Sequence, residues 1–275
     1  MREAFIKRKE GVTFYTSPLL DRYGVCHMFS TRIGGVSGGV FESLNFASGA
    51  GSITDSTENV IKNHSLAAGV FGLTEKDICR SYQTHSSNVE IVSAEHKGTG
   101  ISKEPFLQGV DGLVTAENEL ILSVRTADCV PILLYDYKNR ICAAVHAGWR
   151  GTLGGITAVA IEKMRSLGAD TEYTLAAIGP CVGPCCYEVG REVYESFLSS
   201  DKDFEQCFVK KGDKLSLDLT EANEIILKQN GIKTDNISSA HLCTCCNAGD
   251  FFSHRRSGQN RGTMSALIVI KQRTV

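Results

Sequence analysis

Two histidines and one cysteine, His85, Cys129 and His146, stand next to apolar runs of the sequence. Two imidazoles and a thiolate suit Zn²⁺, and three protein ligands leave a fourth position open, as in catalytic zinc sites. A water bound there can lose its proton near neutral pH and act as a nucleophile. A single buried histidine or cysteine is more often a packing residue, so the metal hypothesis depends on the residues around these three.

The neighbours of these residues strengthen the metal hypothesis. Asp128 places a charge beside a predicted core strand, where charge is costly unless it is used, and it could orient a ligand or accept a proton. Trp149 and Arg150 are flanked by four glycines: Gly148, Gly151, Gly154 and Gly155. Glycines allow a ligand to approach the backbone, and the helix that follows could bind an anion, although an ordinary strand-to-helix turn has the same pattern.

Apolar runs beside the three residues predict strands that must position them. These runs cover residues 120–124, 132–135, 141–146, 175–178 and 267–270. They are nearly continuous rather than alternating, which predicts sheets that are covered on both faces. Helices are expected from about residue 55 and over residues 153–167, 191–198 and 220–229.

Because strands and helices mix without strict alternation, the pattern predicts an α+β fold, a layered α/β arrangement in which helices sandwich mixed sheets. The chain of 275 residues is 42% hydrophobic, enough for a sizeable core, and we expect a single domain over residues 1–275.

Charge and hydropathy exclude several classes of partner. The formal net charge of -2 offers no electrostatic footprint for nucleic acid or an anionic membrane. No stretch approaches the ~20 apolar residues that span a bilayer, and the N-terminal segment lacks the apolar run of a secretory signal. We therefore expect a cytoplasmic monomer or small homo-oligomer that acts on a small molecule.

The chain has 11 cysteines, which in a reducing compartment favour metal binding or catalysis over disulfides. Besides Cys129, they form two groups: Cys181, Cys185 and Cys186, and Cys243, Cys245 and Cys246 beside His241. Cys243 and Cys246 have Cys-x-x-Cys spacing, which is typical of structural zinc or iron–sulfur sites, but the first group offers no second such pair. Adjacent cysteines also point to opposite sides of an extended segment. Core packing and a cysteine-rich pocket rim are therefore favoured over a second metal site.

Longer motifs carry a resemblance to a known family. Residues 126–136 (TADCVPILLYD) and 143–156 (AAVHAGWRGTLGGI) resemble the signature of the laccase-domain purine nucleoside phosphorylases, the YfiH/YlmD-like group formerly described as multicopper polyphenol oxidoreductases. Further matches lie in residues 30–37, 43–45, 83–85, 109–115, 178–180, 185–189 and 251–256. The chain departs from the family at Ser86, where glycine is frequent, and at His64, where the family has arginine.

The resemblance implies an α/β/β/α fold, with zinc ligands at His85, Cys129 and His146. It also implies phosphorolysis of adenosine, inosine, guanosine and methylthioadenosine to the base and ribose 1-phosphate, with deamination of adenosine as a second activity. An activated water suits deamination, and positive groups suit phosphorolysis.

Arginines are the candidates for holding phosphate, because a guanidinium grips it with two hydrogen bonds. The candidate phosphate- or substrate-binding residues are Arg32, Asn45, Arg150, Arg255 and Arg256. For each arginine the alternative is a surface ion pair.

Three other functions compete with this one. A copper-dependent polyphenol oxidase needs several coppers, and the chain has only 7 scattered histidines, although copper could replace zinc at a single site. A cysteine hydrolase would use Cys129 as nucleophile and His146 or His85 as base. A binding protein without catalytic activity is the third alternative.

Overall fold

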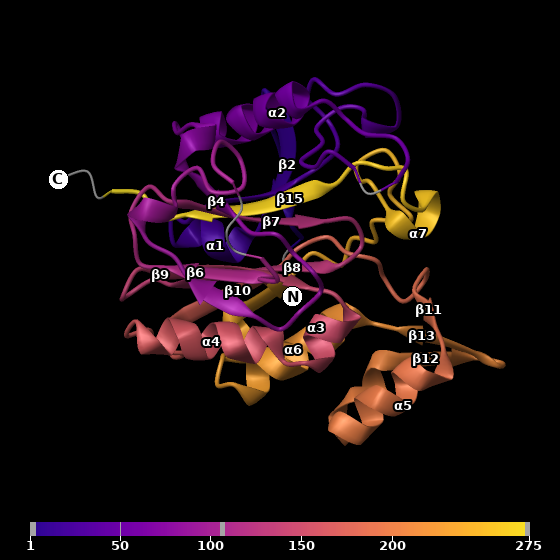
Figure 1. Ribbon diagram of the computed structural model, residues 1–275. Coiled ribbons are helices and arrows are strands. Elements are labelled where there is room, and N and C mark those ends of the chain that lie inside the picture. The colour runs from indigo at the N-terminus through magenta and orange to yellow at the C-terminus, as the bar shows by residue number, and fades with distance from the viewer. Residues whose placement is uncertain (1–3, 50, 105–107, 273–275) are drawn as a thin grey trace.

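The computed structural model describes residues 4–49, 51–104 and 108–272. Two six-stranded sheets lie face to face, and helices cover the outer face of each sheet (Figure 1). This arrangement confirms the predicted layered α/β/β/α fold with mixed sheets. The expectation of a single domain over residues 1–275 stays a prediction.

The first sheet joins both ends of the chain. Its strand order is β1 (Ile6–Glu10), β2 (Val12–Thr16), β3 (Cys26–Ser30), β15 (Met264–Val269), β7 (Ile121–Thr126) and β4 (Ile78–Arg80). Its neighbours pair antiparallel except for β4 and β7, which are parallel. Helix α2 (Thr57–Val70) covers its outer face (Figure 1).

The second sheet carries the most apolar strands. Its order is β14 (Ile237–Ser239), β10 (Thr174–Ile178), β8 (Val130–Asp136), β9 (Ile141–Ala147), β6 (Gly112–Thr115) and β5 (Val89–Ile91). Its outer face is covered by helices α3 (Trp149–Leu153), α4 (Ile156–Ser166) and α6 (Leu219–Gln229) (Figure 1).

The core has three apolar layers, as the continuous strands require. Leu122 of β7 and Leu133 of β8 pack between the two sheets. Ile121 packs toward α2, and Ile132 packs toward α4 and α6. Alternate residues of one strand therefore enter different apolar layers, so polar alternation is missing from these sequences.

A smaller unit lies beside the second sheet. It contains a three-stranded sheet in the order β11 (Glu188–Val189), β13 (Lys214–Leu217) and β12 (Phe208–Lys211), together with α5 (Arg191–Ser200) (Figure 1). Short helices α1 (Pro18–Arg22) and α7 (His254–Ser257) and the 3₁₀ turns Gly39–Phe41, Glu75–Asp77, Ala94–His96, Lys202–Cys207 and Thr234–Asn236 complete the described elements. In the described part of the chain, no helix has the length and apolar character needed to cross a bilayer.

Several elements differ from the sequence-based expectation. Strands β2, β3, β4, β6, β11, β12, β13 and β14 were not predicted, and two further differences have a clear local cause. The helix predicted over residues 153–167 is α4, which begins only at Ile156 because the chain turns at Gly154 and at Gly155, whose φ is +70°. The short helix α3 before this turn was not predicted. Strand β1 was not predicted, because its sequence IKRKE is mostly exposed and has no apolar run.

His64 of α2 is a buried histidine against the first sheet. Its Nδ1 lies 2.8 Å from the Val60 carbonyl oxygen, its ring meets Phe46 edge-on, and its Nε2 has no partner. Burial, reinforced by the charge of Arg80, lowers the pKa of His64 to about 3. The folded protein therefore keeps this imidazole neutral.

This burial predicts acid sensitivity. Below pH ~6.5 the unfolded chain binds a proton at residue 64, whereas the folded chain does not until about pH 3. Stability is therefore complete above pH ~6.5 and falls as the pH drops toward 3. Replacing His64 by Met should make the melting temperature fall less between pH 7.5 and 5, as followed by circular dichroism.

The matched control is His254→Gln, since His254 is exposed and should leave the slope unchanged. The pKa of buried His27 is also lowered by burial, so part of the dependence of melting temperature on pH should remain in both variants. Identical slopes for wild type and His64→Met would contradict the assignment.

Candidate metal centre and active-site cleft

The structure brings His85, Cys129 and His146 together. His85 lies in the loop between β4 and β5, Cys129 in the turn between β7 and β8, and His146 on β9. Each residue offers one possible ligand atom, a ring nitrogen of each histidine and the sulfur of Cys129, and these three atoms all lie within 4.8 Å of one another. The pairing of β8 with β9 places Pro131 opposite His146, which aligns the turn with the imidazole. The predicted trio thus forms a group that could hold a metal ion.

Asp111 is the residue that orients the two histidines. It is fully buried, and one carboxylate oxygen accepts hydrogen bonds from His146 Nδ1 at 2.8 Å and the His85 amide at 3.0 Å. The other oxygen accepts from the Ser86 amide and hydroxyl, both at 2.8 Å, and from the Thr84 amide at 3.0 Å. With Nδ1 donating to a carboxylate, Nε2 of His146 is the nitrogen available to a metal.

Sequence reasoning assigned no role to Asp111, which appeared only within the motif at residues 109–115. The available signal was a carboxylate directly before the apolar strand Gly112–Thr115. Such a charge is costly in a core unless several donors meet it. Here His146 and the hydrogen bonds from Ser86 hold the pKa of Asp111 well below its usual range, against the opposing effect of burial.

Backbone geometry at the trio is specialised. His85 and Asp128 have φ values of 62° and 96°, a left-handed region that non-glycine residues seldom adopt. A Cβ atom at Gly148 would lie 3.0 Å from His85 Cδ2 and 3.1 Å from Cys129 Sγ. Glycine at 148 therefore lets the ligand groups approach one another, which fits a metal site.

Cys129 and His146 form a charge pair when no metal is bound. Burial alone would raise the pKa of Cys129, but the charge of His146 and hydrogen bonds from both histidines lower it to about 6. Burial alone would lower the pKa of His146, but Cys129 and Asp111 raise it to about 9. At neutral pH a metal would meet a ready thiolate and would displace a proton from His146.

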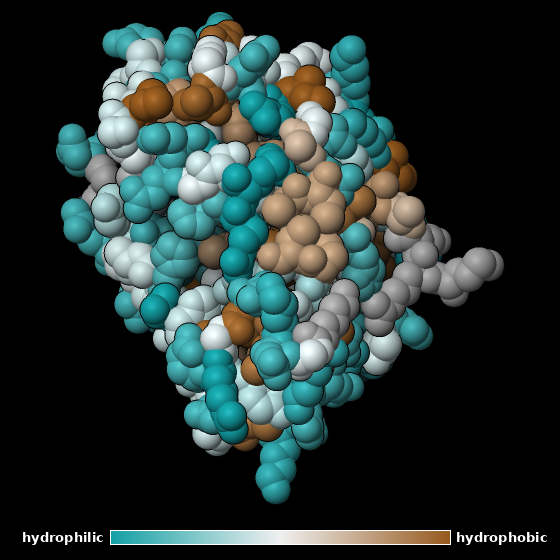
Figure 2. Space-filling view, turned by 90° about the vertical axis from the view of Figure 1, so that its right-hand side faces the viewer, coloured by the Kyte–Doolittle hydropathy of each residue, from teal (hydrophilic) through white to brown (hydrophobic). Residues whose placement is uncertain are grey.

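The trio opens into a cleft of about 680 Å³, a size typical of small-molecule sites. The cleft is lined by His85, Ala127, Asp128, Cys129, Gly148, Trp149, Arg150, Val182, Tyr187, Leu219, His254, Arg255, Gln259 and Arg261. Helix α7, which contributes two of these residues, lies on the face shown in Figure 2, where a moderately hydrophobic patch (tan) borders hydrophilic surface (teal).

Two of the predicted phosphate-binding arginines line this cleft. The Arg150 guanidinium lies 4.2 Å from the centre of the Trp149 ring. Arg255 lies over the Tyr187 ring and donates to the Glu188 carbonyl oxygen at 2.6 Å. Arg261, which sequence reasoning did not single out, lines the same cleft. Three guanidinium groups thus border the space in front of the trio.

The other predicted binding residues lie outside the cleft lining. Arg32 donates to the Glu42 carbonyl oxygen at 2.8 Å and stacks on Phe252. Asn45 is fully buried and donates to the Ala47 carbonyl oxygen at 2.6 Å. Arg256 donates to backbone carbonyls of residues 244, 245 and 251. The structure shows all three fastening loops.

Asp128 also holds neighbouring segments. Its carboxylate accepts hydrogen bonds from Thr244 Oγ1 at 2.5 Å, Ser253 Oγ at 3.0 Å and the Arg255 amide at 2.6 Å. These contacts tie the turn that carries Cys129 to the start of α7. Direct participation of Asp128 in proton transfer stays a prediction.

A row of arginines continues from the cleft along the first sheet. Arg80 on β4 lies opposite Ser123, and Arg125 follows two residues later on β7, on the same sheet face. The Nε atoms of Arg80, Arg125 and Arg261 are buried without a hydrogen-bond partner.

Among the described residues, none of these three arginines forms an ion pair with a carboxylate. Burial lowers the pKa of each, although at Arg261 the charges of Asp128 and Cys129 act in the opposite direction, so an anion in this region would be favoured.

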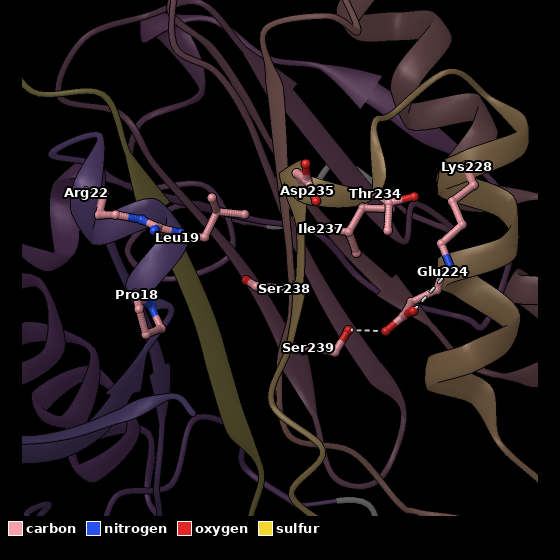
Figure 3. Close-up of a pocket in the computed structure, with 10 residues that line it drawn as sticks. All are labelled: Pro18, Leu19, Arg22, Glu224, Lys228, Thr234, Asp235, Ile237, Ser238 and Ser239. Atoms are coloured by element: carbon pink, nitrogen blue, oxygen red, sulfur yellow. Dashed lines mark hydrogen bonds and ion pairs between the residues drawn. The ribbon is translucent and has the colours of Figure 1, made fainter. Parts of the chain in front are cut away.

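A second cavity, of about 430 Å³, lies between α1 and the segments around α6 and β14 (Figure 3). It shares no lining residue with the cleft. The carboxylate of Glu224 there accepts a hydrogen bond from Ser239 at 2.7 Å and pairs with Lys228 at 3.4 Å. This cavity contains no group like the histidine–cysteine trio, so we assign the chemistry to the cleft.

Comparison with known proteins identifies the family. A family model described as multi-copper polyphenol oxidoreductase laccase matches residues 26–271. The chain belongs to this family. The match spans the metal-ligand group and nearly every strand of both large sheets.

Relatives in this laccase family are named for reactions of purine nucleosides. A purine nucleoside phosphorylase of Bacteroides thetaiotaomicron is 33% identical over 250 residues, covering 90% of this chain and 92% of the relative. Adenosine deaminase RL5, from an unknown prokaryotic organism, is 35% identical, covering 85% and 90%. These catalytic names confirm the prediction of an enzyme.

Solved structures of the family have the same fold. YfiH of Bacillus licheniformis aligns with a TM-score of 0.89 at 30% identity, covering 96% of this chain and 99% of that one. YlmD of Geobacillus stearothermophilus aligns with a TM-score of 0.87 at 29% identity, covering 98% and 100%.

The role of Asp111 can be tested through metal affinity. Replacing Asp111 by Asn removes the charge that orients His146, and loss of such a partner typically weakens metal binding about 10- to 100-fold. We expect this loss for the metal ion that the trio would hold, measured with zinc in competition with a chromophoric chelator. Cys129→Ala, which removes a candidate ligand, should lose binding at the same site.

Asp136→Asn is the matched control for this substitution. Asp136 is also fully buried and accepts several hydrogen bonds, but it lies at the opposite end of β8. It should lower stability and leave the metal affinity of the trio unchanged. Equal metal affinities in the two variants would count against an orienting role for Asp111.

Proposed function

We propose that the protein is a zinc-dependent purine nucleoside phosphorylase that also deaminates adenosine. Its substrates would be adenosine, inosine, guanosine and methylthioadenosine, each cleaved by phosphate to the base and ribose 1-phosphate. The observation that carries the proposal is the trio of His85, Cys129 and His146 at an arginine-bordered cleft. The names of the relatives support the substrate class.

Zinc fits the donor set better than the several coppers of an oxidase. In the described part of the chain, the trio is the one group of three or more candidate ligands that includes histidine. His27 and His64 are buried elsewhere and contact backbone carbonyls. A multicopper enzyme needs more imidazole-rich sites than this. A bound zinc ion would supply a Lewis acid at the cleft.

The residues of the cleft suit a nucleoside and phosphate. Trp149 and Tyr187 offer aromatic faces to a flat purine, while Arg150 and Arg255 offer donors to an anion. Arg261 lines the cleft and is the first residue of the arginine row that continues with Arg125 and Arg80. We place phosphate near Arg261, because guanidinium groups without carboxylate partners favour an anion. These positive groups would also offset charge that develops on the departing base.

The pair of Cys129 and His146 also suits a cysteine hydrolase, since the pKa of the thiol is lowered to about 6. The metal requirement separates the two functions. A thiol nucleophile works without zinc, whereas the proposed enzyme should lose activity with a chelator and regain it when zinc is added. We also place the enzyme in the cytoplasm, where thiols such as that of Cys129 are kept reduced.

Product analysis tests the proposed function directly. The purified protein, assayed for zinc, is incubated with adenosine with and without phosphate, and products are separated by chromatography. We expect adenine and ribose 1-phosphate only with phosphate, and inosine in both reactions. Cys129→Ala should lose both activities, because it lacks a metal ligand.

Cys26→Ala serves as the matched control, since Cys26 lies on β3 away from the cleft lining, and it should keep both activities. Release of no base and no inosine by the zinc-loaded protein would reject the proposal. Oxidation of a phenol by the copper-loaded protein would favour the oxidase instead.

The phosphate position generates a second test. Arg261→Gln removes a charged donor, and a hydrogen bond to a charged group is worth about 1.5–3 kcal/mol. We expect the KM for phosphate to rise about tenfold or more, with deamination of adenosine in the absence of phosphate little changed. Steady-state kinetics of both reactions measure the difference.

Arg165→Gln is the control, because Arg165 is exposed on α4 and bonds the Asn230 carbonyl oxygen. It should change neither reaction. A phosphate KM that Arg261→Gln leaves unaltered would exclude Arg261 as a phosphate ligand.

A further inference from the structure

The two cysteine groups that lie far apart in the sequence are neighbours in the fold. Cys181 and Cys243 form an isolated parallel bridge, in which the Cys181 amide donates to the Leu242 carbonyl oxygen at 3.2 Å. The Thr244 amide donates to the Cys181 carbonyl oxygen at 2.9 Å. This bridge aligns the segment after β10 with the segment after β14. The sequence spacing of the cysteines within each group does not predict that the two groups lie side by side.

Four sulfur atoms meet beside this bridge. The Sγ atoms of Cys185, Cys186, Cys243 and Cys246 all lie within 4.8 Å of one another. Cys246 Sγ is 3.6 Å from Cys185 Sγ and 3.4 Å from Cys186 Sγ. Residues 184–186 form a turn rather than an extended strand, so the adjacent cysteines reach the same cluster. The expectation of core packing holds for Cys181, which belongs to the apolar core, whereas the four other sulfurs form a group that could hold a metal ion.

The sulfur separations match a metal better than a disulfide. Zinc–sulfur bonds of about 2.3 Å at tetrahedral angles place sulfurs ~3.8 Å apart. A disulfide needs about 2.05 Å, and all 11 cysteines are free. Cys185 and Cys246 are exposed, so an ion can enter from solvent.

The backbone around the cluster also suits thiolates. The Gly183 amide donates to Cys243 Sγ at 3.3 Å, a hydrogen bond that orients a ligand sulfur. The Cys243 carbonyl oxygen accepts from the Asn247 amide at 3.1 Å and from its side chain at 2.8 Å, which closes the turn between Cys243 and Cys246. Arg256 donates to the carbonyl oxygens of Thr244 and Cys245 within that turn, which holds its backbone in place.

We propose that Cys185, Cys186, Cys243 and Cys246 bind a structural Zn²⁺ ion, separate from the site of His85, Cys129 and His146. Four thiolates close the coordination shell and leave no open position for substrate. The ion would therefore fasten the two segments to each other and take no part in the reaction.

Both fastened segments contribute to the cleft. Tyr187 follows Cys186 directly and lines the cleft. Thr244, between Cys243 and Cys246, donates to Asp128 beside Cys129. A zinc ion at the four cysteines would thus fix the position of one cleft wall relative to the catalytic turn.

Metal analysis of the intact protein tests the proposal independently of nucleoside chemistry. We expect two zinc ions per chain in the wild type, from the two ligand groups. Cys129→Ala should retain one, and the double variant Cys185→Ser/Cys246→Ser should also retain one. Cys245→Ser, in the same turn but outside the ligand group, should retain two.

Cobalt substitution of Cys129→Ala identifies the ligands of the retained ion. A tetrahedral site with four thiolates should give strong sulfur-to-cobalt charge-transfer absorption, and the double variant should lose it. If the double variant does not fold, alkylation of the wild type supplies the answer. Peptide mapping should show Cys185, Cys186, Cys243 and Cys246 protected until a chelator is added.

Several results would overturn the inference. One is a single zinc ion per wild-type chain, lost in Cys129→Ala. Another is a disulfide among the four cysteines, detected as a mass lower by two hydrogens in protein purified without reductant. Iron with acid-labile sulfide would replace the zinc site by an iron–sulfur cluster. None of these outcomes depends on whether the protein cleaves nucleosides.

Discussion

The carboxylate of Asp111 is the interaction on which the candidate site depends. A fully buried charge is costly, and here hydrogen bonds from one imidazole, three amides and a hydroxyl offset that cost. The same bonds fix the ring of His146 and bend the chain at His85 into its left-handed conformation. One carboxylate thus sets the direction of the His146 ring and the backbone position of His85, two of the three candidate ligands.

The position of Cys129, the third candidate ligand, depends on how the two large sheets are connected. Strand β7 belongs to the first sheet and β8 to the second, so Cys129 lies where the chain passes from one to the other. The apolar layer between the sheets, with Leu122 and Leu133, fixes their separation. Asp128 completes the crossing with a φ of 96° and binds residues of the C-terminal segment. The cleft therefore forms at a junction of both sheets, where polar groups can reach solvent.

Sequence patterns predicted the parts that depend on local order. The apolar strands and the ligand trio were identified because apolar runs and signature motifs are continuous in the chain. Strand β1 was missed because pairing with β2, rather than its own apolar content, makes it a strand. Arg125 and Arg80 were missed because their proximity follows from the register of β4 with β7. Asp111 was missed as an orienting residue for a similar reason, since its partners come from another loop and another strand.

The two walls of the cleft are held by different forces. The strands behind Cys129 and His146 rest on large apolar layers. The segments around Thr244 and α7 have a much smaller apolar cluster, whose buried members are Phe251, Phe252 and Met264. This cluster has far fewer buried side chains than the layers behind the strands, so polar contacts have a larger relative part in holding this wall. Asp128 supplies them from inside, and four cysteines that share a metal would supply the remaining constraint from the solvent side.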